Sequence, residues 1–491
     1  MSMFEKDTRF SGLNGVQAEN DTVSPEQYGL PRSSAQQKLS PLDMNMPRLY
    51  GTRWILCFSL PANVDKAEIY ESLKLGLAHT ISTIPWIAGN VGPEEGRDPK
   101  EGRIQVVDGS GAVKFLYKDL TGILPPYAEL KVENFPISKL STAQLSPLGL
   151  MPEPPQPVMA AQANFIEGGL LLTIGVHHSI CDGSAVDTIL DTWASNTTAS
   201  ESSGSTSFTV YDSTSNDRTP LMTGHPGADL AEFPEYILMP TAPTVTADVN
   251  THQIAATPAT IPPMTSHIFY FSPASLTAIK TAASAFSTND ALCAFLWQHM
   301  TLARNPTDSS RVEKSTKTSS LLFSVNIRGR TSPPLPPTYL GNASMAVITD
   351  HFPISLLTVT ATDYDSGLSR AAAAIRRSLN AVNTPNRVPL TIGLIDSRPN
   401  PTDYKFAYNG FLGTDISATS WADFGVYKRE WGGLLGKVEA FRVPGEGADG
   451  VVVVFPRTEE GGLEVMVGLE DGAMGRLMGD VRFIESAKLR G

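Results

Sequence analysis

The chain has 491 residues, of which 41% are hydrophobic and 18% are charged, and its formal net charge is −12. A single hydrophobic core rarely grows to this length, so two domains of ordinary size are expected. The acidic balance excludes a typical nucleic-acid binder, which would carry a basic stripe. No apolar run reaches the length of a membrane span, and the N-terminus lacks the apolar core of a signal peptide.

The cysteines indicate a reducing environment. Cys57, Cys181 and Cys293 are odd in number and widely spaced. This spacing matches neither a disulfide framework nor a zinc knuckle. We therefore expect a cytoplasmic protein.

The first part of the chain predicts alternating strands and helices. Residues up to about Gln37 are polar and are expected to be loose. Residues 66–84 predict a helix, because Ile69, Leu73, Leu77 and Ile81 share one face, and Pro85 ends it. Strands are predicted at residues 54–60, 103–107, 158–166 and 170–176.

The second part repeats this alternation after a change of composition. Residues 195–263 are rich in Ser, Thr, Pro, Ala and Asp and predict a long crossover with little core of its own. Strands follow at 267–271 and 321–327, helices at 276–285, 288–303 and 368–382, and a hairpin at 450–457 and 462–469. The fold class is therefore α/β, with domains at residues 38–195 and 266–491 joined by a crossover at 196–265.

Residues 177–183, with the sequence HHSICDG, have the clearest chemical meaning. The apolar run before them, residues 169–176, is typical of a strand buried on both faces. Apolar residues at helical spacing follow from Ala185 to Trp193. The pair His177 and His178 thus stands where a buried strand ends and a helix begins. A neutral imidazole held there suits a general base.

Two other interpretations of these residues stay open. The pair His177 and His178 could close a turn within the core. Alternatively, His178 and Asp182 could be metal ligands, but a zinc site needs at least a third ligand. The other six histidines are scattered without paired spacing, so no metal is expected.

A second landmark lies near the C-terminus. Thr419, Ser420 and Trp421 precede the segment 430–438, which reads EWGGLLGKV. The tripeptide at 423–425 spells the magnesium-binding DFG of kinases, but the other kinase motifs are missing. Further short motifs stand at residues 39–43, 287–297, 326–336 and 339–343.

Together these motifs resemble the BAHD acyltransferases, and HHxxxDG is shared with chloramphenicol acetyltransferases and peptide-synthetase condensation domains. In the BAHD family a Thr-Ser-Trp often precedes DFGWG. Here Glu430 and Trp431 replace the Asp and Phe, extra residues precede Gly436, and Val438 replaces a Pro. These departures resemble the fungal members that act in secondary metabolism. The resemblance covers nearly the whole chain.

The resemblance implies two chloramphenicol-acetyltransferase-like domains with mixed sheets flanked by helices. It implies transfer of an acyl group, expected to be acetyl, from coenzyme A to an alcohol, without a covalent acyl-enzyme. In this scheme His178 is the general base and Trp421 the oxyanion candidate. Asp182 is structural and pairs with an arginine, Arg328 first and Arg330 second.

The remaining residues have supporting roles in this scheme. His177 and Thr419 support the site, and Gly183 lets the chain turn sharply after the motif. The resemblance places Ser420, Gly436 and Lys437 toward coenzyme A. Acyl-CoA is a co-substrate, no cofactor is expected to stay bound, and the protein is expected to be a monomer without nucleic-acid partners. The alternatives are a condensation-type N-acyl transfer enzyme and an inert binding protein of the same fold.

Overall fold

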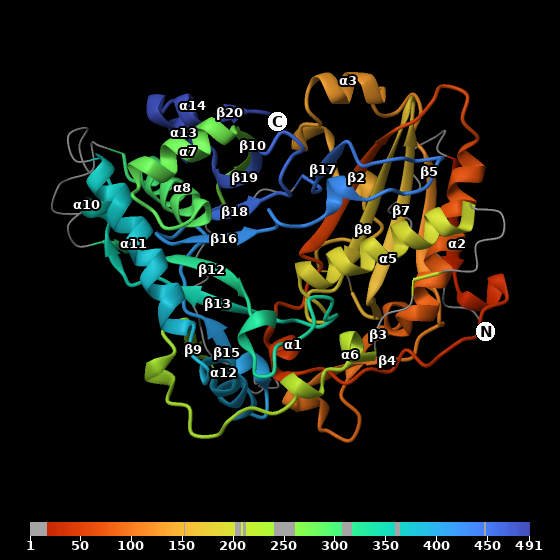
Figure 1. Cartoon of the computed structure of the whole chain (residues 1–491), viewed down its shortest axis with the longest axis horizontal. Coiled ribbons are helices and arrows are strands. Elements are labelled where there is room, and N and C mark those ends of the chain that lie inside the picture. Colours follow the sequence, from red (N-terminus) through yellow and green to blue (C-terminus); the bar gives the residue numbers. More distant parts are fainter. Residues whose placement is uncertain are drawn as a thin grey trace, which may run out of the picture.

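A computed structural model of the chain describes residues 17–151, 153–201, 208–209, 213–239, 261–306, 317–358, 364–445 and 448–491. It contains two large mixed sheets that lie side by side, each with helices packed on it (Figure 1). The α/β class and the mixed sheets flanked by helices are as the sequence predicts. No helix among these residues is long and apolar enough to cross a membrane.

The first sheet has six strands in the order β1-β5-β7-β8-β2-β17. Strands β5 and β7 run parallel, and the other neighbouring pairs are antiparallel. Helices α2 and α5 pack against each other on one face of this sheet (Figure 1). The bounds are β1 Gln17–Val23, β2 Thr52–Ser59, α2 Lys66–Thr83, β5 Val113–Asp119, β7 Met159–Ile166, β8 Gly169–Val176, α5 Gly183–Glu201 and β17 Ala440–Arg442.

Helix α2 forms where the sequence predicts it. The side chain of Asp65 accepts hydrogen bonds from the backbone N–H groups of Ala67 and Glu68, which satisfies two free donors of the first turn. The four predicted apolar residues are buried, and Leu73 is fully buried beneath the sheet. The same core includes the fully buried Trp54 and Trp193.

The second sheet has seven strands in the order β13-β12-β16-β18-β19-β10-β20. Strand β16 runs parallel to β12 and β18, and the other neighbours are antiparallel. Helix α8 is the central helix of this half and packs against α7, α11 and α13 (Figure 1). The bounds are β10 Met264–Phe271, α7 Pro273–Ala282, α8 Thr288–Arg304, β12 Leu321–Asn326, β13 Ser344–Ile348, α11 Tyr364–Val382, β16 Ile416–Ser420, β18 Val451–Val454, β19 Leu463–Glu470, α13 Asp471–Met478 and β20 Lys488–Leu489.

Smaller elements complete the structure. Strands β4, β3 and β6 form a three-stranded sheet, and the pairs β15–β9 and β11–β14 form two-stranded sheets. These strands are β3 Asn90–Pro93, β4 Ile104–Val107, β6 Gln156–Pro157, β9 Tyr236–Leu238, β11 Thr318–Ser319, β14 Phe352–Pro353 and β15 Tyr404–Phe406. The remaining helices are α1 Pro41–Asn45, α3 Tyr127–Val132, α4 Thr142–Leu145, α6 Ser213–Asn216, α10 Ile354–Leu357, α12 Arg387–Asp396 and α14 Val481–Ser486.

The structure differs from the sequence prediction at the N-terminus. Residues 17–23 form β1, although this polar stretch was expected to be loose. The strand lies at the edge of the first sheet, where one side of the strand has no neighbour in the sheet order. An edge strand tolerates a polar sequence, and here the apolar anchor is the fully buried Val23.

Two further differences concern the segment between the halves and strand β17. Helix α5 continues to Glu201, and the described part of the crossover has buried side chains of its own. Leu221, Phe233 and Tyr236 belong to a third apolar cluster together with residues of α12. Strand β17 comes from the C-terminal part of the chain but pairs with β2 in the first sheet. The chain therefore exchanges elements between its two halves.

Candidate active site

The loop between β8 and α5 carries the HHxxxDG motif. At its start, the backbone N–H of His177 donates to the carbonyl of Val158 (2.9 Å), and that of His178 donates to Leu49 (2.8 Å). At its end, the carboxylate of Asp182 accepts the backbone N–H of Ala185 (2.9 Å) and so caps the first turn of α5. Both ends of the loop are thus anchored on rigid elements.

His178 is half-buried, and its Nδ1 is shielded from solvent. The ring packs over Gly51, where an added Cβ would lie 3.3 Å from Cδ2. Burial lowers the pKa of His178, and three smaller effects oppose this shift: a main-chain hydrogen bond of His178, the charge of Asp182 and a hydrogen bond from the Asn342 side chain. His178 is therefore held neutral near pH 7, the state in which a histidine can accept a proton.

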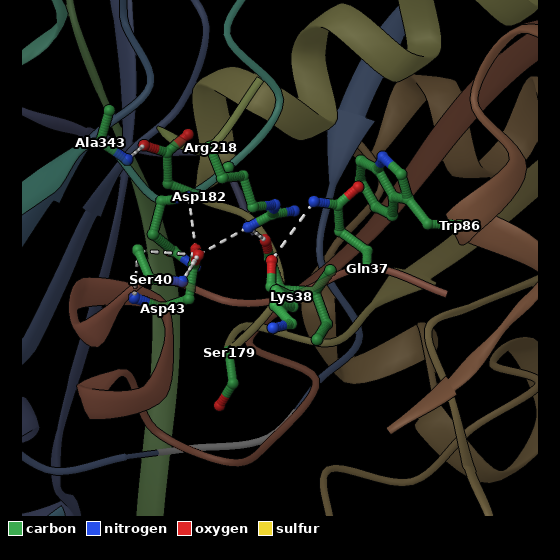
Figure 2. A network of polar contacts seen from close by, with 12 residues as sticks. Gln37, Lys38, Ser40, Asp43, Trp86, Ser179, Asp182, Arg218 and Ala343 are labelled. Carbon is green, nitrogen blue, oxygen red and sulfur yellow. Dashed lines mark hydrogen bonds and ion pairs between the residues drawn. The ribbon is translucent and has the colours of Figure 1, made fainter. Parts of the chain in front are cut away.

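The carboxylate of Asp182 is held by other residues and not by His178. Its carboxylate accepts hydrogen bonds from Nη1 and Nη2 of Arg328, both at 2.9 Å, and both residues are buried. The backbone N–H of Ala343 donates to the same carboxylate (2.8 Å) (Figure 2). With the bond from Ala185, four donors surround Asp182, and none belongs to His178. This geometry makes Asp182 a clamp between the motif loop and the segment before β13.

His177 is fully buried beside His178. Its Nδ1 accepts the backbone N–H of Ser179, and its Nε2 lies 3.3 Å from Oε1 of Gln156. Its ring meets Tyr50 edge to face at 5.2 Å between centroids. Burial, followed by the charges of His178 and Arg48, lowers the pKa of His177 to about 4. The neutral His177 therefore packs and braces the loop.

A second buried ion pair reaches the same loop, and the sequence did not reveal it. Nη1 of Arg218 donates to Oδ2 of Asp43 (2.7 Å) and to the carbonyl of Ile180 (2.9 Å) (Figure 2). Asp43 also forms a capping box with Ser40 at the start of α1. Residues 39–43 are one of the family-like motifs, but nothing around Arg218 marks it within the Thr- and Ser-rich crossover.

Asn342 links this second pair to the histidine. Its backbone N–H donates to Oδ1 of Asp43 (2.8 Å), and its side-chain Nδ2 donates both to Asp43 (3.0 Å) and to the carbonyl oxygen of His178 (3.0 Å). Asn342 is fully buried. Two ion pairs and one amide thus hold the motif loop between the two halves of the molecule.

Trp421 lies next to the end of the motif. A Cβ added at Gly183 would lie 3.2 Å from Nε1 of Trp421 and 3.2 Å from the ring of Phe424. Gly183 is not among the glycines with a positive φ, so its role is not a left-handed backbone; its small size admits these two rings. Trp421 is 8% exposed and stacks on Phe455. Thr419 lies in β16 opposite Val453.

The residues expected near coenzyme A do not share one cavity. Ser420 lines a cavity of about 350 Å³ together with Asn326, Arg330 and Arg457. Lys437 lines another cavity, of about 460 Å³, and lies 3.4 Å from Glu430 in an exposed ion pair.

Gly436 has a φ of 67°, and its backbone N–H closes a turn by donating to the carbonyl of Gly432 (2.8 Å). This left-handed conformation favours glycine. The segment around Gly436 and Lys437 therefore has a clear structural role of its own.

The metal interpretation gains no support from this geometry. Across the described ranges, no group of three or more His, Cys, Asp or Glu side chains is placed to hold a metal ion. Asp182, the second ligand that this interpretation requires, is occupied by Arg328.

Comparison with known proteins agrees with the arrangement. The profile described as Transferase family matches residues 18–483. Acyltransferase BOA11 of Botryotinia fuckeliana is 31% identical over 90% of this chain and 95% of its own length. Eremophilane O-acetyltransferase ORF8 of Penicillium roqueforti is 28% identical over 92% of this chain and 98% of its own.

Solved structures show the same fold. The crystal structure of TRI101 from F. sporotrichioides, complexed with coenzyme A and T-2, matches 93% of this chain and all (100%) of its own, with a TM-score of 0.78 at 22% identity. The chain therefore belongs to the Transferase family and is an acyltransferase of the BAHD type, as its motifs predict.

Proposed function

We propose that this chain transfers an acyl group, in the simplest case acetyl, from a coenzyme A thioester to a hydroxyl group of a secondary metabolite. The observation that carries the proposal is the state of His178, a half-buried residue with a neutral imidazole whose Nδ1 is shielded. Relatives over most of the chain include an eremophilane O-acetyltransferase, and TRI101 structures hold coenzyme A with T-2, a mycotoxin. These names support a terpenoid-like alcohol as the acceptor class.

The mechanism must first make the acceptor hydroxyl group a better nucleophile. An alcohol is a weak nucleophile until a base takes its proton during the attack. His178 takes that proton as the alcohol oxygen bonds to the thioester carbonyl carbon. The carbonyl becomes a tetrahedral oxyanion, and the indole N–H of Trp421 is the candidate donor that stabilises it. Collapse breaks the carbon–sulfur bond, and His178 returns the proton to the leaving thiolate, so no covalent acyl-enzyme forms.

Supporting residues keep this geometry in place. Asp182 and Arg328 fix the end of the motif loop, and His177 braces its start. Thr419 and Ser420 are the last two residues of β16, and Trp421 follows them directly. The cavity beside Ser420 contains the cations Arg330 and Arg457, which suit a phosphate-bearing co-substrate. We assign coenzyme A to this face first, and to the Gly436 and Lys437 segment second.

The proposal includes a monomer acting in the cytoplasm. The three cysteines are free and buried, as expected in a reducing compartment. Size-exclusion chromatography with light scattering measures the first point, and a dimer that disappears only with loss of activity would contradict it.

The experiment is thiol release from acetyl-CoA over a panel of hydroxylated terpenoid, alkaloid and polyketide alcohols, with wild type beside His178→Ala. We expect turnover in wild type and its collapse in the variant, with an unchanged melting temperature. Matched amines in the panel test the condensation-type alternative. Protection of the fold by coenzyme A without thiol release from any acceptor would favour an inert binding protein.

A further inference from the structure

A cavity of about 360 Å³ lies where segments from the two halves of the chain meet. One wall is the end of α1 and the residues that follow it, and α1 packs against α12 and the turn before β15 (Figure 1). Asn45 joins the walls, because its Nδ2 donates to the carbonyls of Pro401 (2.8 Å) and Tyr404 (2.9 Å). We refer to it as the Arg48 cavity, and its lining residues are Asn45, Met46, Pro47, Arg48, Thr402, Tyr404, Lys405 and Phe406.

The lining of the Arg48 cavity is apolar and cationic. Met46 and Tyr404 are buried and Phe406 is half-buried, so these side chains supply apolar walls. Arg48 and Lys405 bring two positive charges, and none of the described lining residues is acidic. Ligand sites of this size combine apolar walls with a few polar groups that fix orientation. The lining therefore suits an organic anion with an apolar body.

Arg48 is a half-buried cation with no counter-charge among the described residues. Its Nη2 donates to the carbonyl of Gly102, and its Nε is shielded without a hydrogen-bond partner in the same part of the chain. Burial lowers the pKa of Arg48, and no carboxylate opposes that shift. Guanidinium groups are rarely buried unless they are paired. An anion in the cavity would supply both the missing charge and the missing acceptor.

The acidic side chains beside this contact are engaged by other arginines. Arg103 donates to Glu94 (2.6 Å) and to Asp396 (3.0 Å). Glu101 lies 3.7 Å from Arg97. None of these carboxylates is therefore available to neutralise the cation of the cavity.

The cavity shares a wall with the HHxxxDG loop. Oγ of Ser179 donates to the carbonyl of Met46 (3.0 Å), and the backbone N–H of His178 donates to the carbonyl of Leu49 (2.8 Å). The segment that carries the cation is thus hydrogen-bonded to the loop that carries the base. A molecule held in this cavity lies beside that loop.

The cavity assigned first to coenzyme A is built from other residues. It contains Arg330 and Arg457, and it shares no lining residue with the Arg48 cavity. An enzyme that joins two substrates needs two binding regions. The Arg48 cavity is therefore open to the acceptor.

We propose that the Arg48 cavity binds a carboxylate group of the acceptor, so that the preferred acceptor is an apolar molecule with both a hydroxyl and a carboxylate. The inference rests on the proposed function, because His178 must take the proton of that hydroxyl. Arg48 donates to the carboxylate, and the exposed Lys405 adds a second charge. The carboxylate takes no part in bond making; it positions the acceptor while the hydroxyl reacts.

A purely structural role for Arg48 is the competing explanation. In that case the guanidinium only ties the segment after α1 to the carbonyl of Gly102. Replacement of Arg48 would then lower stability and affect charged and uncharged acceptors equally. Only a carboxylate site makes the effect depend on the charge of the acceptor.

The binding test compares ω-hydroxydodecanoic acid with its methyl ester by isothermal titration calorimetry, with coenzyme A present. The two probes differ in one methyl group and in the charge at that end. We expect the acid to bind about 10- to 100-fold more tightly, the effect of hydrogen bonds between charged groups. Equal dissociation constants in wild type would overturn the inference. Acetate that binds as tightly as the long acid would also overturn it, by showing a site for small anions only.

Three variants assign the preference to the cations of the cavity. Arg48→Met keeps an apolar stem without the charge, so the preference for the acid is expected to fall to about 3-fold or less. Arg48→Lys keeps the charge and is expected to restore part of the preference. Lys405→Met changes an exposed side chain, leaves the fold intact and is expected to lower the preference about 2- to 5-fold. A full preference in Arg48→Met would overturn the inference.

The matched control is Arg330→Met. Arg330 is also half-buried, donates to a main-chain carbonyl, that of Asn326, and has a shielded Nε without a partner among the described residues. It lines the other cavity, so we expect its variant to raise the KM for acetyl-CoA and to keep the preference for the acid. An equal loss of that preference in Arg330→Met and Arg48→Met would overturn the inference.

A kinetic readout separates failure of the inference from failure of the proposed function. Thiol release from acetyl-CoA is measured with ω-hydroxy acids of different chain lengths and with their methyl esters. We expect kcat/KM to be higher for the acids and to peak at one length, because the carboxylate is fixed while the hydroxyl must reach His178. Thiol release with equal kcat/KM for acids and esters would overturn the inference alone. Acid-selective binding that depends on Arg48 but gives no thiol release at any length would overturn the proposed function and support the carboxylate site.

Discussion

Two histidines in this molecule, His178 and His299, differ in what their ring nitrogens contact. His299 lies in α8 and is 1% exposed. Its Nδ1 lies 2.6 Å from Oδ2 of Asp480, and its Nε2 lies 2.7 Å from the hydroxyl of Tyr364. Nδ1 of His178, in contrast, has no side-chain partner at hydrogen-bond distance within the described ranges, and the residue is half-buried.

The carboxylate–histidine–hydroxyl chain at His299 looks more like a catalytic triad than the arrangement at His178 does. Both nitrogens of His299 are, however, engaged by groups that join α8 to α11 and α14. Burial raises the pKa of Asp480, but the hydrogen bond and charge of His299 outweigh it and lower that pKa below its usual value. A base needs a free ring nitrogen, and both ring nitrogens of His299 are engaged. His299 therefore stabilises the helical layer.

The same substitution at both sites separates these roles. We expect His178→Gln to lower kcat about 10²- to 10⁴-fold, the usual contribution of a general base, without a change in melting temperature. His299→Gln removes buried hydrogen bonds, one of them to a carboxylate, and is expected to destabilise the fold by about 2–4 kcal/mol. Thiol release and urea unfolding measure the two effects.

The reverse result would contradict the roles assigned to His178 and His299. If folded His299→Gln loses turnover while His178→Gln retains it, proton transfer belongs to the second half of the molecule. Activity must be expressed per folded protein, because the His299 variant is expected to unfold partly during the assay. Circular dichroism at the assay temperature supplies that correction.

Asp182→Asn tests whether the carboxylate of the motif is structural. The variant places an amide against donors from Arg328, Ala343 and Ala185, which leaves the guanidinium buried without its counter-charge. We expect a loss of about 3–5 kcal/mol in the free energy of unfolding. The acid limb of kcat/KM is expected to move only slightly to lower pH, because Asp182 raises the pKa of His178 through its charge but makes no hydrogen bond to it.

A double variant sharpens this result. Replacing both partners in Asp182→Asn/Arg328→Met removes the unpaired charge, so its destabilisation is expected to be smaller than the sum of the two single changes. Strict additivity would show that the pair is not coupled. A large shift of the acid limb in Asp182→Asn would instead give the carboxylate a part in proton transfer.

The sequence predicted those parts of the site that depend on residues close together in the chain. A buried strand, the HHxxxDG loop and an amphipathic helix are consecutive in the chain, so the place of His178 followed from periodicity alone. The partner of Asp182 came from the family resemblance, and Arg328 is the residue that the structure places there. The main helices and strands were likewise predicted because their apolar residues repeat at short range.

What the sequence did not reveal depends on long-range contacts. Arg218 lies in a segment of biased composition, and only the fold brings it against Asp43, 175 positions earlier in the chain. Strand β17 is three residues long, and its pairing with β2 has no local signal. Ser420 and Lys437 are close in sequence but line separate cavities.

Trp421→Phe tests the proposed oxyanion donor. The phenyl ring retains an aromatic partner for Phe455 and for Trp54, whose centroid lies 5.3 Å from Trp421, but it lacks the indole N–H. We expect kcat to fall about 100-fold, near the lower end for loss of one oxyanion donor, with a small change in the KM for acetyl-CoA. Unchanged kcat in the folded variant would leave Trp421 as a packing residue only.

The smallest expected effect concerns His177, the buried neighbour that is neutral for packing reasons. Its folded-state pKa of about 4 lies below the ordinary value of 6.5, so the neutral form is favoured by folding. Its contribution is therefore present above pH 6.5 and is lost as pH falls toward 4, which amounts to about 2 kcal/mol between about pH 7.5 and about pH 5. Urea unfolding at these two pH values is expected to show a smaller loss in His177→Gln than in wild type. Equal losses would mean that His79 and His178, whose pKa values are also lowered by burial, account for the pH dependence without His177.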